Sequence, residues 1–404
     1  MPGSEALDTY RFGPFRLEIR ERRLSRGDEV IPLRGKVFDT LSVLVENAGR
    51  LVTKQELLDA VWPETTVEEN NLNHNVSVLR KALGERATGQ HYIETVPKVG
   101  YRFAAQVEGA GSPAGSTAPL TATVRQEIRY CTTNDGVRLA YASIGSGPPL
   151  VKASNWLTHL DLEWASPIWR HWWAALSAHH RVIRYDERGN GMSQRDVPEV
   201  SFDTWVRDLE TVVDAAGLDR FALLGISRGG PIALAYAVKH PDRVTHLVLY
   251  GAFPVGLNHV GKPHELEARR ALVSLMRLGW GLNNPAFCKM FTRRFIPEAT
   301  PEQEQWFDEL QRVSTSPENA AHLMEVDDLI DVRPLLSQVW TPTLVIHCDR
   351  DHAVAPEEGR LLAAGIPGAR YVSLPSANHL VLETEAAWPL FLEELGLFLN
   401  WPRP

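Results

Sequence analysis

The sequence predicts two domains of different class, an α+β domain followed by an α/β domain whose sheet is mostly parallel. The 404 residues exceed what one hydrophobic core usually serves. Residues 108–120, EGAGSPAGSTAPL, are rich in Gly, Pro and Ser, which is typical of a flexible linker. The spacing of apolar residues also differs on the two sides of this segment. We therefore expect the first domain at 8–107 and the second at 121–404.

Composition narrows the class of protein. The apolar fraction of 44% and the charged fraction of 23% are typical of globular proteins. No apolar run approaches the roughly 20 residues that span a bilayer, and the first residues lack the pattern of an export signal. The three cysteines are far apart, which argues against a disulfide framework or a zinc site. We expect a cytoplasmic protein with no metal, no cofactor and no membrane partner.

The net charge of -8 is unevenly distributed between the two domains. Residues 1–108 contain 15 Lys and Arg against 16 Asp and Glu, so the second domain carries most of the negative charge. A nearly neutral first domain can bind nucleic acid only if its charges are well placed.

The first domain shows patterns for strands, three helices and a hairpin. Thr53, followed three residues later by Glu56, is a capping box that opens the second helix, and Pro63 ends it. The expected elements are short antiparallel strands within 10–33, helices over 36–48, 55–62 and 68–83, and a hairpin over 92–103.

The third helix is amphipathic. Leu72, Val76, Leu79 and Leu83 share one face, so the opposite face is polar. Asparagine can bond adenine bidentately, and Lys or Arg can bond phosphate or guanine. The candidate DNA-contacting residues are Asn70, Asn73, His74, Ser77, Arg80 and Lys81 on this helix, and Lys98 and Arg102 on the hairpin. The alternative is that they form the solvated face of an ordinary amphipathic helix.

Three ordered segments strengthen the DNA-binding interpretation: LRGKVFDTLSVLVENAGRLVTKQELLDAVW, NVSVLRKALGE and YIETVPKVGYRF. Together they resemble the winged-helix DNA-binding domain of OmpR/PhoB-type response regulators, which CadC- and ToxR-type regulators also use. The resemblance implies promoter DNA as a partner, and it admits RNA polymerase and a second copy of the chain. No receiver domain precedes the winged helix here, so we expect the signal to enter through the second domain.

The second domain alternates strands with helical segments, which indicates a mostly parallel sheet with covering helices. Between about 253 and 338 the alternation stops, and we expect an inserted helical cap. The strand candidates are LAYASIG, PPLVKAS, RVIRYD, FALLGIS, THLVLYG, TPTLVIHC and ARYVSL.

The segment FALLGISRGGPIALAYAVKHP places Gly-x-Ser-x-Gly between a strand and a helix, which is the context of a nucleophile elbow. Ser227 is the candidate nucleophile. Asp351 and His379 follow two later strands in the order acid and then histidine, where parallel sheets place their sites. Asp349 is an alternative acid.

Residues from about 121 to 401 resemble an α/β-hydrolase through YDERGNGMS, GISRGG, IHCDRD and SANH. The resemblance implies a Ser227, His379 and Asp351 triad, with an oxyanion hole formed by the backbone N–H groups of Arg228 and Trp156. The family usually has His-Gly in the loop after PPLVKAS, whereas this chain has Ser154-Asn155-Trp156.

Three hypotheses follow from joining these two domains. The protein is a transcriptional regulator whose hydrolase domain binds, and hydrolyses, a small ester, lactone or related acyl ligand. Alternatively, it is primarily a serine hydrolase with an accessory DNA-binding domain, or a sensor whose hydrolase domain binds without catalysis.

Overall fold

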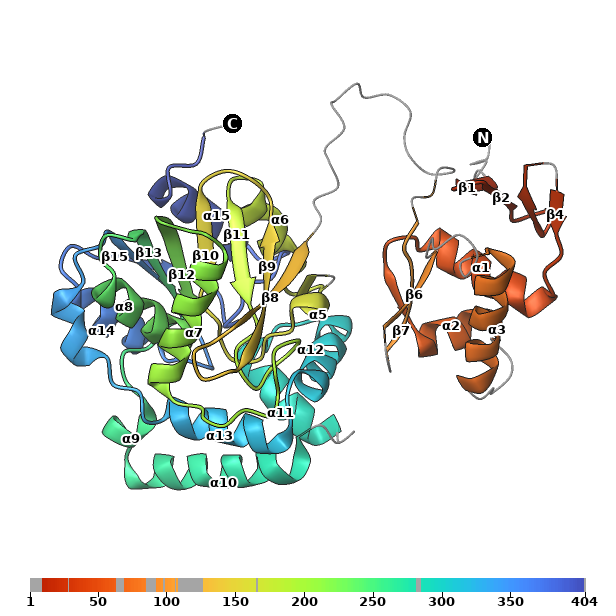
Figure 1. Cartoon of the computed structure of the whole chain (residues 1–404). Coiled ribbons are helices and arrows are strands. Elements are labelled where there is room, and N and C mark those ends of the chain that lie inside the picture. Colours follow the sequence, from red (N-terminus) through yellow and green to blue (C-terminus); the bar gives the residue numbers. More distant parts are fainter. Residues whose placement is uncertain are drawn as a thin grey trace. The chain divides into compact units, whose positions relative to one another are not determined.

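In the computed structural model the chain divides between Leu120 and Thr121 into an N-terminal and a C-terminal unit (Figure 1). The first described elements of the N-terminal unit are antiparallel strands. The predicted linker lies outside the described residues, so its flexibility stays a prediction. The structure describes residues 9–27, 29–62, 69–84, 92–96, 99–105, 107, 126–164, 166–280 and 285–402.

The described residues of the N-terminal unit form two small antiparallel sheets and three helices, which confirms its predicted α+β class. One sheet has the strand order β1-β2-β3-β4 and the other β5-β7-β6. The elements are β1 Thr9–Phe12, β2 Phe15–Glu18, β3 Arg23–Arg26, β4 Glu29–Ile31, α1 Gly35–Glu46, β5 Leu51–Thr53, α2 Lys54–Val61, α3 Glu69–Ala82, β6 Ile93–Val96 and β7 Gly100–Phe103.

The short strand β5 was absent from the sequence prediction, because three residues carry too little periodicity. It pairs with β7 and joins the hairpin to the helices. A Cβ at Gly100 would lie 2.0 Å from the carbonyl oxygen of Val52, so this close pairing requires glycine.

The predicted capping box is confirmed at the start of α2. Glu56 N donates to Thr53 Oγ1 at 3.2 Å, and Thr53 N donates to Glu56 Oε2 at 2.7 Å. Both bonds satisfy backbone groups that the first turn leaves without helical partners.

Replacing Thr53 by alanine is expected to destabilise the N-terminal unit by about 1 kcal/mol, because the cap is lost. Thr53→Ser keeps the hydroxyl and is the matched control. The urea dependence of hydrogen exchange in peptides from 35–62 measures the effect. Equal losses in the two variants would show that the side-chain oxygen is not what stabilises the helix.

The C-terminal unit is built on an eight-stranded sheet with the order β15-β14-β13-β12-β10-β11-β9-β8 (Figure 1). The five pairings from β11 to β15 are parallel, while β9 and β8 run antiparallel at one edge. The predicted mostly parallel sheet is confirmed. The strands are β8 Glu127–Thr132, β9 Arg138–Ile144, β10 Pro149–Lys152, β11 Arg181–Tyr185, β12 Phe221–Ile226, β13 Val244–Tyr250, β14 Thr343–Cys348 and β15 Arg370–Leu374.

Helices cover both faces of this sheet. Alternate strand residues point to opposite faces, and they join two separate apolar clusters. One cluster includes residues of α7, α8 and α14, and the other includes residues of α6 and α15. The helices that flank the strands are α5 Leu160–Trp164, α6 Arg170–Ser177, α7 Phe202–Ala215, α8 Gly229–Lys239, α14 Pro356–Gly365 and α15 Ala387–Phe398.

Between β13 and β14 the chain forms a group of helices that gathers at one end of the sheet (Figure 1). We call this group the cap. Within the described part of the chain, no helix has both the length and the apolar character needed to cross a membrane. The cap comprises α9 Leu257–Val260, α10 Pro263–Gly279, α11 Pro285–Phe295, α12 Pro301–Ser314, α13 Pro317–Asp327 and the 3-10 helix η1 Arg333–Gln338.

Candidate active site

Ser227 lies where β12 ends and α8 begins, in a backbone conformation that few residues adopt. Its φ is +52°, in the left-handed region where a residue with a side chain is strained. A Cβ at Gly225 would lie 2.6 Å from the Gly229 carbonyl oxygen, and one at Gly229 would lie 2.9 Å from the Ser154 carbonyl oxygen. The two glycines are therefore required because strand, helix and neighbouring loop pack closely around the serine.

The loops after β14 and β15 bring Asp351 and His379 into contact. His379 Nδ1 lies 2.6 Å from Asp351 Oδ2, and both side chains are buried. The other carboxylate oxygen accepts from the N–H groups of Ala353 at 2.8 Å and Val354 at 3.1 Å. Burial alone would raise the pKa of Asp351, but the imidazole and these hydrogen bonds hold it below its ordinary value. Asp351 is thus kept as a carboxylate beside the ring.

The second ring nitrogen of His379 is available for chemistry. His379 Nε2 is buried and has no hydrogen-bond partner among the described residues. Because Nδ1 faces a carboxylate, it carries the proton, and Nε2 then presents its lone pair. Ser227 and His379 line the same cavity. The alternative acid, Asp349, is exposed and accepts from the Ser376 N–H at 3.2 Å.

Asp351 also faces a second histidine that sequence reasoning missed. His347 Nε2 lies 3.5 Å from Asp351 Oδ2 and 3.0 Å from the Val354 carbonyl oxygen. Burial lowers the pKa of His347. Its position within a strand, TPTLVIHC, gave no signal of this contact.

The cavity beside Ser227 is small and largely apolar. Its volume of about 10 Å³ is roughly what one water molecule needs. The cap closes it with side chains of α11 and α12, so a larger ligand requires the cap or its side chains to move. The lining residues are Asn155, Trp156, Leu157, Trp169, Ser227, Phe295, Phe307, Leu310, His379 and Leu380.

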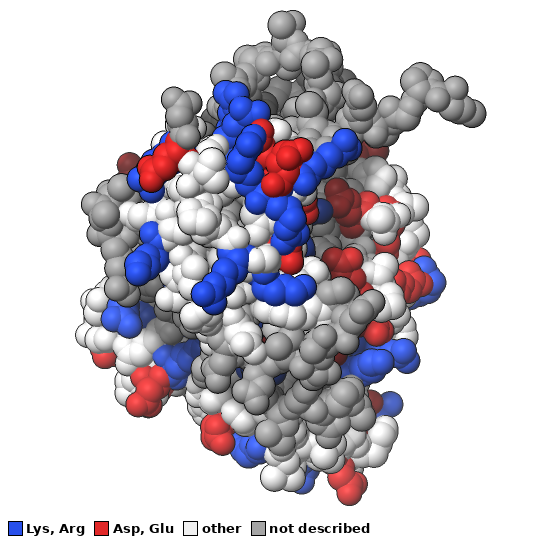
Figure 2. Space-filling model, turned by 90° about the vertical axis from the view of Figure 1, so that its right-hand side faces the viewer, with Lys and Arg blue, Asp and Glu red and all other residues white. Residues whose placement is uncertain are grey.

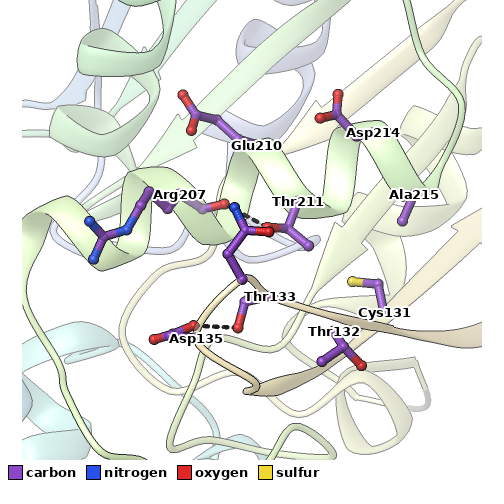
Figure 3. Close-up of a pocket in the computed structure, with 10 residues that line it drawn as sticks. Cys131, Thr132, Thr133, Asp135, Arg207, Glu210, Thr211, Asp214 and Ala215 are labelled. Carbon is purple, nitrogen blue, oxygen red and sulfur yellow. Dashed lines mark hydrogen bonds between the residues drawn. The ribbon is translucent and has the colours of Figure 1, made fainter.

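A larger hollow of about 710 Å³ lies elsewhere, between α7 and the β8–β9 turn (Figure 3). Its lining includes Thr133, Asp135, Arg207 and Glu210, but none of Ser227, Asp351 and His379. The candidate catalytic residues Ser227 and His379 therefore line the small cavity and not this larger hollow.

Of the two predicted oxyanion donors, Trp156 lines this cavity and Arg228 directly follows Ser227 in the chain. Among the described residues, no acceptor is recorded for the backbone N–H of Trp156 or of Arg228. Asn155, which replaces the expected glycine, is buried and donates from Nδ2 to the Trp156 carbonyl oxygen at 3.3 Å. Its Oδ1 accepts from the buried Lys152 ammonium, a partner that sequence reasoning missed.

The predicted apolar face of α3 is buried, and its polar face is exposed. Asn73, His74, Ser77 and Lys81 are all exposed. The side chain of Asn70, and Lys98 as a whole, lie outside the described residues. No pattern in the sequence predicted a structural role for Asn75. Its Nδ2 donates to Thr40 Oγ1 at 3.0 Å, which connects α3 to α1.

Three of the predicted DNA-contacting side chains hold the winged hairpin in place. Arg80 donates to the Ile93 carbonyl oxygen at 2.8 Å, and Asn73 accepts from the hydroxyl of Tyr101 at 2.7 Å. Arg102 forms an ion pair with Glu94 at 3.1 Å. Figure 2 shows acidic side chains among the basic ones on the face it presents.

Comparison with known proteins decides the family of the C-terminal unit. Residues 160–386, more than half of the chain, match the model of the alpha/beta hydrolase fold. The chain belongs to the α/β-hydrolase fold family. Residues 27–103 match the C-terminal domain of transcriptional regulatory proteins, which points to a DNA-binding regulator.

Individual hydrolases resemble the C-terminal unit. Pyrrolizixenacetamide deacetylase of Xenorhabdus hominickii is 26% identical over 265 residues, which cover 66% of this chain and 97% of that protein. The AB hydrolase superfamily protein YisY of Bacillus subtilis is 25% identical over 253 residues, covering 62% and 91%. The crystal structure of the enol-lactonase from Burkholderia xenovorans LB400 is 28% identical with a TM-score of 0.56, covering 67% of this chain and all of that one.

In this member of the α/β-hydrolase fold family the side chain of Arg228 joins the turn that carries Ser227 to the cap. Its Nη2 donates to Glu187 Oε1 at 2.5 Å, and its Nη1 donates to Asp327 Oδ1 at 3.2 Å, where α13 ends. The guanidinium also lies 4.4 Å from the ring centroid of Trp205. Burial raises the pKa of Glu187 to about 8 although Arg228 opposes it, and it raises that of Asp327 in the same way.

Proposed function

We propose that the protein is a DNA-binding transcriptional regulator whose hydrolase domain binds and hydrolyses a small ester, lactone or related acyl compound. The observation that supports this most is the 2.6 Å contact between His379 Nδ1 and Asp351 Oδ2, because His379 also lines one small cavity together with Ser227. This arrangement has the parts of a Ser-His-Asp triad in the chain order of the family.

In the proposed reaction Ser227 Oγ attacks the carbonyl carbon of the ligand. His379 Nε2 takes the serine proton as the new C–O bond forms, and later gives it to the leaving group. Asp351 holds the ring in the required tautomer and stabilises its cation. The backbone N–H groups of Trp156 and Arg228 donate to the oxyanion. Water then attacks the acyl carbon while His379 Nε2 takes its proton; the bond to Ser227 Oγ breaks, the acid is released, and His379 returns the proton to Ser227 Oγ.

The cavity favours a compact, apolar acyl group. Its walls include Trp156, Trp169 and Phe307 and offer few polar partners. The similar proteins include one named a deacetylase and one named an enol-lactonase, which supports an ester, amide or lactone carbonyl as the reacting group.

A sensor that binds without catalysis is the second candidate. The closed cavity and Asn155 in place of glycine favour it. A fluorophosphonate probe and chromogenic short-chain esters, applied to the wild type and to Ser227→Ala, separate the two. Labelling and turnover that depend on Ser227 support the enzyme. If both are absent in the wild type, a reporter assay decides whether ligand occupancy alone carries the signal.

The N-terminal domain is proposed to place α3 in the major groove of promoter DNA, in the cytoplasm, with Asn70, His74 and Ser77 toward bases. Lys81, Lys98 and Arg102 would contact phosphates. RNA polymerase and a second copy on a paired half-site are the further partners that we propose.

Lys81→Ala is expected to weaken binding to the DNA upstream of the protein's own gene, and to lower the slope of log affinity against log salt by about 1. Lys239→Ala removes the same charge from the hydrolase domain, where Lys239 pairs with Glu210, and is expected to change neither. Fluorescence anisotropy at several salt concentrations makes the measurement. Identical curves for the two variants would remove Lys81 from the interface.

A further inference from the structure

The loop that carries Trp156 is held by a buried lysine. Lys152, the last residue of β10, is only 1% exposed, and its ammonium donates to Asn155 Oδ1. Asn155 in turn donates to the carbonyl oxygen of Trp156 at 3.3 Å. These contacts connect the end of a central strand to the residue whose N–H we assign to the oxyanion hole.

The surroundings of Lys152 explain why its side chain turns toward this loop. Its Nζ lies 5.7 Å from the ring centroid of Trp169 and 6.0 Å from that of Trp173, within the range of cation–π attraction. Burial lowers the pKa of Lys152 to about 8, against the opposing effect of Glu163. A buried ammonium needs a hydrogen-bond acceptor, and the Asn155 side chain supplies one.

The loop is also anchored on either side of Asn155 and Trp156. Ala153 N donates to the Leu224 carbonyl oxygen at 2.9 Å on the neighbouring strand, and the carbonyl oxygen of Ser154 faces Gly229. Leu157 has a φ of +53°. The segment between these anchors is Asn155-Trp156. The Trp156 ring packs against Trp280 and Arg228, and the side chain of Asn155 is held by Lys152.

We propose that Lys152 and Asn155 act together as positioning residues, which orient the Trp156 N–H toward the oxyanion and replace the flexible glycine of the family's His-Gly loop. The inference rests on the proposed hydrolysis. It gives Asn155, which stands where the family has glycine, a role in catalysis. The Lys152 ammonium anchors the Asn155 side chain, and this anchor takes the place of the glycine turn in holding the backbone donor.

The test is a double-mutant cycle with p-nitrophenyl acetate as substrate. Lys152→Met and Asn155→Ala are each expected to lower kcat about tenfold or more, with KM changed less than about threefold, because removing one oxyanion donor outright costs about 100- to 1000-fold. The double variant is expected to lose no more than the worse single variant. Lys239→Met, which removes a half-exposed ammonium, is the control and is expected to keep wild-type kinetics.

Hydrogen exchange separates positioning from general loss of structure. In Lys152→Met, peptides covering 153–159 are expected to exchange faster, while peptides from the β12–α8 turn exchange as in the wild type. Losses that multiply in the double variant, or a Lys152→Met rate within twofold of wild type, would overturn the inference while the proposed function stands. If the wild type itself has no turnover, the proposed function fails, and unchanged exchange at 153–159 would then overturn the positioning as well.

Discussion

Ser227→Ala is expected to lower kcat for ester hydrolysis by a factor on the order of 10⁴ to 10⁶, and to abolish fluorophosphonate labelling. The serine oxygen is the proposed nucleophile, and no other described residue that lines the cavity carries a hydroxyl group. His379→Ala is expected to cost a similar factor, since His379 Nε2 is the proposed base for the serine proton.

The two losses are not expected to multiply. When two residues act as one catalytic unit, removing either one removes the contribution of both. The double variant Ser227→Ala/His379→Ala should therefore have a kcat similar to that of either single variant. His352→Ala is the matched control, because His352 is exposed and follows Asp351 directly; its kcat is expected to equal that of the wild type. Steady-state kinetics with chromogenic esters measure all four variants. Equal turnover in the wild type and Ser227→Ala would reject the proposed chemistry and leave a binding role.

Arg228→Met is expected to lower the free energy of unfolding of the hydrolase domain by roughly 3 kcal/mol. The change keeps the length of the side chain but leaves the carboxyl groups of Glu187 and Asp327 without their shared cation. The expected loss is at the lower end for a broken buried ion pair, because both carboxyl groups can take up a proton instead.

The loss is expected to grow with pH. Burial raises the pKa of both carboxyl groups in the folded state, and without Arg228 the main opposing charge is gone, although Arg269 still lowers the pKa of Asp327. The folded state then binds protons that the unfolded state has released, so the free energy of unfolding falls as pH rises above the unfolded value of about 4.5. The loss at pH 8 should therefore exceed the loss at pH 5.

Urea unfolding followed by tryptophan emission measures this effect, because all tryptophans except Trp62 lie in the hydrolase domain. Arg243→Met is the matched control. Arg243 pairs with Asp214, whose side chain is 66% exposed, and breaking such a pair is expected to cost at most about 1 kcal/mol. Adding Glu187→Gln and Asp327→Asn to Arg228→Met should restore part of the stability. An Arg228→Met loss as small as the control's would mean that the buried network contributes little.

Local patterns predicted much of the fold because they reflect local physics. The capping box at Thr53 and the apolar stripe through Leu72 and Leu79 follow from helix geometry alone. The parallel strands were recognisable because both of their faces are buried and their residues are almost all apolar. The three-residue strand β5 and the edge strand β8 were missed, because a short or half-exposed strand has a weaker pattern.

The sequence by itself determined the two fold classes, the order of Ser227, Asp351 and His379, and the departure at Asn155. Each of these was read from short motifs of consecutive residues. Only the tertiary structure brought Asp351 rather than Asp349 to the imidazole, closed the cap over the cavity, and gave Arg228 its partners. Glu187 and Asp327 are 41 and 99 residues from Arg228 in the chain, and the buried Lys152 ammonium lies over the rings of Trp169 and Trp173. These contacts depend on the burial of charge between distant segments, which no local pattern of residues records.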